Sequence, residues 1–193
     1  MALEQVLATV RTHERNDAPE FPGARHSAVL VALFDQGQGA EVILTRRAWH
    51  LSSHRGEVSF PGGRSDPGET AVQAALREAE EEILLDPRLV TIVGELDHLA
   101  TVVSRSLIVP VVAVLDDPPE VAPGTSEVDR VLTVPLHDLM RDDTYRQEIW
   151  GAPPLDRPIH FFELDDETVW GATARILVQL LALATGTHDP GGW

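Results

Sequence analysis

Four glutamates crowd into the stretch REAEEE, at residues 77–82. On a helix, residues three and four apart share a side, so Glu78, Glu81 and Glu82 face together and Glu80 does not. Like charges at this spacing destabilise a helix by about 0.2–0.5 kcal/mol per pair. Arg77, four residues before Glu81, offsets only part of that repulsion. The cluster therefore calls for a further positive charge nearby.

A glycine pair, Gly62 and Gly63, precedes the glutamates. It helps to identify the positive charge that could offset their repulsion. The simpler interpretation of four glutamates is a solvated charged face. Glycine, however, permits close backbone approach to a ligand, and carboxylates with a few waters and substrate phosphates suit magnesium. The chain has no cysteine, and its histidines lack the HExxH spacing of zinc sites. These residues also fit an oxygen-liganded divalent ion beside a diphosphate, and both interpretations stay open at this point.

Composition restricts the class of partner. Among 193 residues, 15 are Lys or Arg and 31 are Asp or Glu, giving a formal net charge of −16. That charge repels nucleic-acid backbones and anionic membranes. The first fifteen residues lack an apolar signal core, and the longest uncharged apolar run, SLIVPVVAVL, is too short to span a bilayer. We expect a cytoplasmic protein, monomeric or homodimeric, with a small-molecule partner and neither a nucleic-acid nor a membrane partner.

Strand and helix patterns must position these residues. Residues 1–25 predict a helix followed by a Pro- and Gly-bearing connector, and a single domain is expected over residues 1–193. SAVLVALFD and AEVILTRR flank QGQG as a predicted hairpin. Further strands are predicted at RLVTIVGEL, LIVPVVAVL, DRVLTVPL and IHFFEL, and long helices at residues 69–85 and at ETVWGATARILVQLLALATG. Strands and helices that do not alternate regularly favour an α/β sandwich with a mixed sheet between helical layers.

The glutamate helix, residues 69–85, also carries an apolar stripe. The stripe consists of Val72, Ala75, Leu76, Ala79 and Ile83. At its start, Asp66 with Pro67 fits an N-cap followed by proline, and Glu69 fits a capping-box acid. The cap is one interpretation of Glu69.

The spacing over residues 63–85 resembles the Nudix box, the signature of the Nudix hydrolase family. The matching residues are Gly63, Glu69, Arg77, Glu78, Ala79, Glu81 and Glu82. The resemblance implies a Nudix-type α/β/α sandwich that uses magnesium, or manganese, to hydrolyse a nucleoside diphosphate linked to another group. By position, it makes Glu78 and Glu82 the main metal ligands and Gly63 a carbonyl ligand. Glu81 becomes a further ligand or a catalytic base, and Glu78 part of the catalytic set. The resemblance also implies that Glu69 braces the metal site through Arg77, and this role and the cap both stay open.

The upstream stretch ILTRRAWHLSSHRGEVSFPGG is similar to the extra motif of the coenzyme A pyrophosphatase branch. The matching residues are Leu44, Thr45, Arg47, Ala48, Gly56, Phe60, Pro61, Gly62 and Gly63. VWGATARIL is similar to the last helix of that branch. The resemblance implies cleavage of coenzyme A, or of an acyl derivative, to 3',5'-ADP and a 4'-phosphopantetheine product. The motif arginine expected at residue 52 is Ser52, which keeps ADP-ribose, NADH or another nucleotide diphosphate as an alternative substrate.

Four residues are candidates for substrate binding. They are Arg47, His54, Arg55 and Phe60. Strand alternation places Arg46 and Arg47 on opposite faces, so at most one of them faces the substrate, and Arg47 matches the motif. Arg55 is the nearest replacement for the missing motif arginine, and arginine supplies bidentate phosphate binding. His54 fits a loop hydrogen bond as well as it fits a ligand contact.

Glu127 and Leu84 leave the catalytic machinery open. Glu127 precedes a predicted strand where several enzymes of this family carry a loop glutamate proposed as general base, although an exposed loop acid is the simpler interpretation. Leu84 stands where the Nudix box has glycine, so the helix is expected to run on to Leu85 and to stop before Pro87. A non-catalytic binding or regulatory protein is therefore a third alternative. Trp49 and Trp170 fit an adenine stack or ordinary packing.

Overall fold

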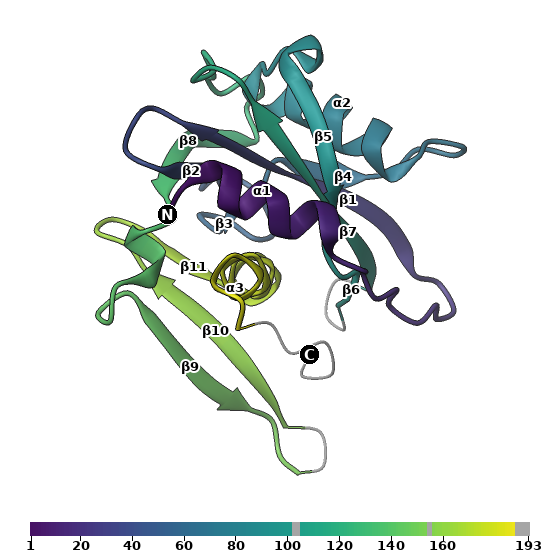
Figure 1. Ribbon diagram of the computed structural model, residues 1–193. Helices are drawn as coiled ribbons and strands as arrows, with labels where there is room; N and C mark the ends of the chain where they lie inside the picture. The colour runs from purple at the N-terminus through teal and green to yellow at the C-terminus, as the bar shows by residue number, and fades with distance from the viewer. Residues whose placement is uncertain (102–104, 154–155, 188–193) are drawn as a thin grey trace.

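The computed structural model describes residues 1–101, 105–153 and 156–187 of the chain (Figure 1). The helices are α1 (Leu3–Thr12), α2 (Ala71–Ile83) and α3 (Gly171–Thr185), with short 3-10 turns at Pro87–Leu89 and Asp138–Met140. The strands are β1 (Arg25–Asp35), β2 (Ala40–Arg47), β3 (Val58–Ser59), β4 (Gly62–Arg64), β5 (Val90–Glu95), β6 (Leu99–Ala100), β7 (Ser106–Leu115), β8 (Val128–Pro135), β9 (Tyr145–Trp150), β10 (Arg157–Glu163) and β11 (Thr168–Trp170). The predicted N-terminal helix is thus present, and each predicted strand has a counterpart.

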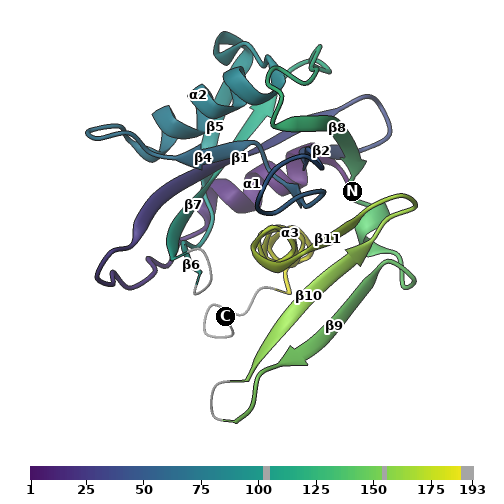
Figure 2. The ribbon, with the colours of Figure 1, turned by 180° about the vertical axis from the view of Figure 1, so that it is seen from behind.

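The central sheet is mixed, as the sequence predicted. Its main path runs β3-β2-β1-β7-β5, while β4, β6 and β8 pair with β1, β7 and β2 respectively. The predicted hairpin is the antiparallel β1–β2 pair, and β1 runs parallel to β7 over nine residue pairs. Figures 1 and 2 show α2 on one side of this sheet and α1 with α3 on the other. The α/β/α sandwich is therefore confirmed.

Strand alternation divides the core into two layers. Along β1, Leu30 and Ala32 belong to the cluster that packs on α2, while Val31 and Leu33 pack with α1 and α3. The small residues of α2 in that cluster are Ala74, Ala75 and Ala79, joined by Ile83. Alanines allow the helix to lie close to the sheet. The opposite side of α2 is thereby left to its charged residues.

Helix α2 is shorter than the predicted range of 69–85 at both ends. It begins after Thr70, whose hydroxyl accepts from the Gln73 amide while the Gln73 side chain accepts from the Thr70 amide. The capping box is therefore formed by Thr70 and Gln73, and the prediction that used Asp66 and Glu69 is wrong. At the other end, Leu84 is left-handed, with φ 59° and ψ 26°. The prediction that the helix runs on to Leu85 is wrong because Leu84 takes the cap conformation that glycine usually supplies.

A second, three-stranded antiparallel sheet of order β11-β10-β9 lies beside α3 and was not predicted. Its edge strand β9 has six exposed residues and no apolar alternation, so nothing in its pattern marks a strand. The predicted C-terminal helix lost its first turn to this sheet. Val169 lies in β11 rather than on the helix, and α3 begins only at Gly171.

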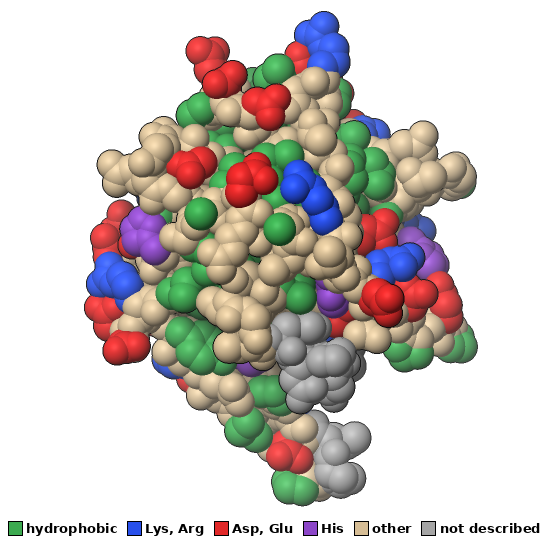
Figure 3. All heavy atoms as spheres, in the orientation of Figure 1, with side chains coloured by type: hydrophobic (Ala, Val, Ile, Leu, Met, Phe, Trp, Pro, Cys, Tyr) green, Lys and Arg blue, Asp and Glu red, His purple; other side chains and the backbone are tan. Residues whose placement is uncertain are grey.

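The surface is acidic without a single concentrated patch on the visible face. In Figure 3 the acidic side chains form several separate groups, with arginines among some of them. Within the described ranges, none of the helices combines the length and the apolar character needed to cross a membrane.

Candidate active site

Gly63 and Glu78 lie against each other where β4 passes α2. A Cβ atom built on Gly63 would stand 2.5 Å from the carboxyl carbon of Glu78 and 2.5 Å from its Oε1. Any side chain at residue 63 would therefore displace this carboxylate. Glycine at this position therefore leaves room for the Glu78 carboxylate and lets the backbone of β4 approach it closely.

Gly62 and Glu82 form the second contact between β4 and α2. The Gly62 N–H donates to Glu82 Oε2 at 3.0 Å. A Cβ atom on Gly62 would also meet the Ala28 carbonyl oxygen at 2.4 Å, so β1 excludes a side chain here. Burial raises the pKa of the Glu82 carboxyl to about 7; the Gly62 hydrogen bond opposes this rise, and the Glu78 charge adds to it. Glu82 is thus a half-buried carboxylate whose charged form is poorly stabilised.

Arg77 binds two acidic side chains, those of Glu69 and Glu78. Its guanidinium bonds Glu69 through Nε at 3.0 Å and through Nη2 at 3.1 Å, and bonds Glu78 Oε1 through Nη1 at 2.9 Å. Nη2 also donates to the Arg64 carbonyl at 3.1 Å, which ties α2 to β4. These bonds raise the pKa of Arg77, with the Glu69 bond the largest cause. Glu69 therefore contacts Arg77 as expected, and its Oε2 also accepts from the Asp66 amide at 2.8 Å, although the helix itself begins only after Thr70.

Glu81 is placed differently from Glu78 and Glu82. Its side chain is 56% exposed, and its nearest cation is Arg77, with Nη1 3.6 Å from Glu81 Oε2. Within the ranges that the structure describes, no three His, Asp or Glu side chains gather at the spacing of a metal site. The three glutamates therefore share one side of the helix, as expected, without converging on a point. Glu78 and Glu82 lie against the glycine strand, while Glu81 turns toward solvent.

The side chains of Arg47 and Glu127 contact each other near Glu82. Arg47 Nη2 lies 3.3 Å from Glu127 Oε2, and the Ala48 amide donates to the Glu127 carbonyl at 2.7 Å. The Glu127 charge raises the pKa of Glu82 and the Arg47 charge lowers it, so both side chains act on the same carboxylate. Arg47 Nε is buried and has no hydrogen-bond partner in the described part of the chain. An unsatisfied buried donor of this kind is costly unless a ligand or water binds it.

The segment before Glu127 is docked on the C-terminal end of α2. The Ala122 amide donates to the Ile83 carbonyl at 3.1 Å, and the Gly124 amide donates to the Glu82 carbonyl at 2.9 Å. A Cβ atom on Gly124 would stand 2.2 Å from the Glu81 carbonyl oxygen. These bonds satisfy carbonyls that a helix end leaves free. They also fix Glu127 relative to the glutamate helix, a long-range relation that the sequence did not reveal.

The remaining predicted residues lie around the loop between β2 and β3. His54 has φ 53° and its Nδ1 lies 2.8 Å from Glu57 Oε2, so the structure gives it a loop contact. Arg55 lines a cavity described below. Phe60 is only 2% exposed and belongs to the apolar core. Its assignment as a substrate-contacting side chain is therefore corrected, because no ligand can reach its ring. Ser52 is exposed in the same loop.

The donor atoms fit a hard divalent cation. Glu78 and Glu82 offer carboxylate oxygens that lie against Gly63 and Gly62 of β4, and thiolates are absent from the chain. The burial of Glu82 gives an independent reason, since a cation would relieve the cost of its negative charge. The expectation that Gly63, Glu78, Glu81 and Glu82 hold a metal stays a prediction; the structure places Glu78 against Gly63 and Glu82 against Gly62, and leaves Glu81 exposed.

Comparison with known proteins places the chain among related sequences. The NUDIX domain family matches residues 24–154. Nudix hydrolase 22, chloroplastic, of Arabidopsis thaliana is 39% identical over 169 residues, covering 80% of this chain and 54% of that protein. The chain thus spans about half the length of this plant relative. "Uncharacterized Nudix hydrolase NudL" of Photorhabdus laumondii is 32% identical over 157 residues, covering 81% of this chain and 83% of that protein.

A solved structure supports the same fold. The MutT/nudix family protein from Enterococcus faecalis superposes with a TM-score of 0.57 over 98% of this chain and 73% of that chain. Its sequence is 17% identical, so this likeness concerns the fold alone.

Proposed function

Because the chain belongs to the Nudix hydrolase family, we propose that it hydrolyses the diphosphate bond of a nucleoside diphosphate derivative with the help of magnesium or manganese. The observation that carries the proposal is Glu82. It is a half-buried carboxylate, bonded to the Gly62 amide and near Glu78, and its removal from water raises its pKa to about 7. A fold seldom retains such a destabilising group unless a cation or substrate uses it.

In this proposal each residue has a separate task. Glu78 and Glu82, with the Gly63 carbonyl, hold the cation, and Arg77 orients Glu78 through its hydrogen bond at 2.9 Å. The cation, when bound, neutralises the diphosphate charge and orients a water for attack on phosphorus. The guanidinium of Arg47, whose side chain is 28% exposed, supplies donors for a phosphate oxygen.

Either Glu127 or Glu81 accepts the proton of the attacking water. The two side chains are equally exposed, 57% for Glu127 and 56% for Glu81. We favour Glu127, because its charge acts on Glu82 and its loop is bonded to α2. A base that is fixed near the ligands needs no further ordering when the substrate binds.

Coenzyme A or an acyl-coenzyme A is the preferred substrate, on the strength of the motif that includes Arg47, Gly56 and Gly62. Incubation with coenzyme A and magnesium, followed by mass spectrometry, should yield 3',5'-ADP and 4'-phosphopantetheine. Glu82→Gln should lower the rate by orders of magnitude, while Glu80→Gln, on the exposed side of the same helix, should leave it unchanged. An unaltered rate in Glu82→Gln would remove the proposed role of this residue.

Ser52 favours a second candidate, a Nudix pyrophosphatase for ADP-ribose, NADH or another nucleotide diphosphate. Serine lacks the planar fork that arginine offers to phosphates, and the residue is exposed at the loop where the motif arginine would stand. A panel of these nucleotides, assayed beside coenzyme A, separates the two candidates. Ser52→Arg should then raise coenzyme A turnover; if it does not, residue 52 is not the determinant.

A further inference from the structure

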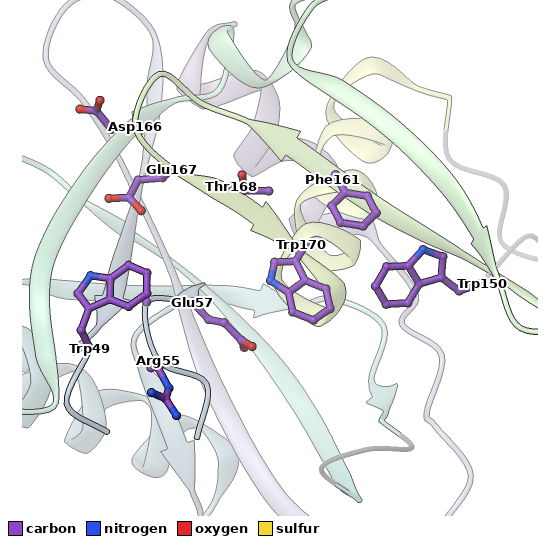
Figure 4. Close-up of a pocket in the computed structure, with 10 residues that line it drawn as sticks. Trp49, Arg55, Glu57, Trp150, Phe161, Asp166, Glu167, Thr168 and Trp170 are labelled. Carbon is purple, nitrogen blue, oxygen red and sulfur yellow. The ribbon is translucent and has the colours of Figure 1, made fainter. Parts of the chain in front are cut away.

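A cavity of about 450 Å³ lies between the β2–β3 loop and the second sheet. Trp49 and Arg55 line it from the loop, and Trp150, Phe161 and Trp170 line it from β9, β10 and β11 (Figure 4). Phe162 and Val169, the alternate residues of β10 and β11, pack in the core with α3. The cavity therefore lies on the face of the sheet turned away from α3, where no core packing requires aromatic residues.

The aromatic rings form a connected but open surface. The Phe161 and Trp170 rings are nearly parallel, at 10° and 6.3 Å between centroids, and the Trp150 and Trp170 centroids are 6.1 Å apart. Arg146 covers the Phe161 ring at 3.9 Å from its centroid. The three indoles nevertheless stay accessible: Trp49 is 62% exposed, Trp150 45% and Trp170 36%. Large aromatic side chains gathered with their faces open are typical of binding surfaces.

Both walls of the cavity are held in place. A Cβ atom on Gly56 would stand 2.5–2.8 Å from three atoms of the Trp49 ring, so this glycine lets the indole pack flat against the loop. On the other wall, Glu167 has a side chain only 9% exposed, with Oε1 2.5 Å from Arg46 Nη1 and 3.6 Å from Arg130 Nη1. These ion pairs fasten the β10–β11 turn to β2 and β8. The aromatic surface is therefore preorganised rather than dependent on a ligand for its shape.

The cavity is connected to the candidate active site through Arg47. The Gly56 amide donates to the Arg47 carbonyl at 3.0 Å, and the Arg47 amide donates to the Glu57 carbonyl at 2.9 Å. From Glu57 the chain reaches Gly62 in five residues, a span of at most about 18 Å. One extended nucleotide substrate can thus reach from the cavity to the Glu78 and Glu82 carboxylates.

We propose that this cavity is the subsite for the purine base of the substrate's nucleoside half. The proposal rests on the proposed function and names the part of the substrate that the cavity takes. Planar bases stack on aromatic side chains, whereas flexible aliphatic groups do not require ring faces. The carboxylates of Glu57 and Asp166 on the cavity wall accept hydrogen bonds from a ring amino group and repel additional phosphates. This charge pattern selects the base over the phosphate-bearing parts of the molecule.

Binding of AMP tests the subsite without any bond cleavage, because AMP carries the base but no diphosphate anhydride. Calorimetry on the full chain should show that Trp49→Ala and Trp170→Ala each weaken AMP binding by about tenfold. Ile149→Ala is the matched control, since Ile149 is 60% exposed and adjoins Trp150 on the opposite face of β9; it should leave AMP affinity unchanged. Ribose 5-phosphate, which lacks a base, should bind wild type and Trp49→Ala equally. Unchanged AMP affinity in Trp49→Ala would overturn the proposal.

Turnover kinetics separate this proposal from the proposed function. With an active substrate, Trp49→Ala should raise KM about tenfold and leave kcat within twofold, because a base stack contributes equally before and during the reaction. If Trp49→Ala turns over substrate with an unchanged KM, the subsite proposal is refuted while the proposed hydrolysis is supported. If the tryptophan variants bind AMP more weakly but the wild-type protein cleaves no nucleotide, the subsite proposal is supported and the proposed hydrolysis is refuted. Should Trp170→Ala fail to fold, as circular dichroism would reveal, the more exposed Trp49 decides the question.

Discussion

Glu82→Gln should make the metal-free protein more stable at neutral and alkaline pH while it removes activity. The wild-type carboxylate is half-buried near Glu78, and burial raises its pKa from 4.5 to about 7. Glutamine has nearly the same shape, carries no charge, and keeps an oxygen that accepts the Gly62 N–H. The substitution therefore removes an unfavourable buried charge without opening a cavity.

The sign and magnitude follow from the difference in proton affinity between the folded and unfolded chain. Below pH 4.5 both states carry the proton on Glu82, and the residue gives no pH dependence. Between pH 4.5 and 7 the folded state keeps a proton that the unfolded state has lost, so the stability of wild type falls as pH rises. At about 1.4 kcal/mol per pKa unit, the loss reaches about 3 kcal/mol above pH 7. We expect Glu82→Gln to exceed wild type by about 2–3 kcal/mol at pH 8 and by little at pH 4.5.

Urea denaturation followed by circular dichroism, with EDTA present, measures this difference at each pH. Glu80→Gln is the matched control, because its side chain lies on the exposed side of α2 and should show no such pH dependence. Saturating magnesium should reduce the difference in unfolding free energy between Glu82→Gln and wild type, since the cation binds folded wild type more tightly than the variant. Equal stability of wild type and Glu82→Gln at pH 8 would refute the argument that burial of the Glu82 charge destabilises the metal-free fold.

Three further substitutions test other parts of the site. Leu84→Gly should stabilise the protein by about 0.5–1 kcal/mol. It relieves the left-handed conformation of leucine, which costs about 1–2 kcal/mol, but glycine also increases the entropy of the unfolded chain and so offsets part of the gain. Leu84→Ala is its control in the same urea experiment, and a lower midpoint for Leu84→Gly would contradict the strain argument. Gly124→Ala should destabilise by about 1–3 kcal/mol and lower kcat, because its Cβ would meet the Glu81 carbonyl oxygen at 2.2 Å; unchanged values would show that the loop docks differently. Glu127→Gln should reduce kcat about 100-fold or more and Glu81→Gln less than tenfold at saturating magnesium, and the reverse order would make Glu81 the base.

The glutamate helix could be predicted from sequence because its relations are local. Spacing of three and four residues determines which side chains share a helix face, so Glu78 and Glu82 were correctly paired. Even here the ends were misjudged. Thr70 and Gln73 form a capping box that the more conspicuous Asp66-Pro67 obscured, and Leu84 takes a conformation that its residue type disfavours.

Contacts between distant segments could not be predicted in the same way. The Arg47–Glu127 pair joins residues eighty positions apart, and it depends on the pairing of β2 with β8. Neither residue carries a local sign of this partner. The burial of Phe60 could not be predicted either. Its match to the motif gave no indication that the ring belongs to the core.

The second sheet adds a reason why the base subsite escaped prediction. Trp150 lies on β9, which is recognised as a strand only once it pairs, whereas the strand of Phe161 was predicted without its partners. Gly56 lets Trp49 pack on its loop, and the ion pairs of Glu167 fix the β10–β11 turn. Each indole alone fits ordinary packing, and only their shared exposure on one face distinguishes a ligand surface from a core. The substrate preference left open by Ser52 therefore depends on two surfaces together, the phosphate contacts near Arg47 and the aromatic cavity. A Ser52→Arg change that raises turnover without changing AMP affinity would show that the two surfaces act independently.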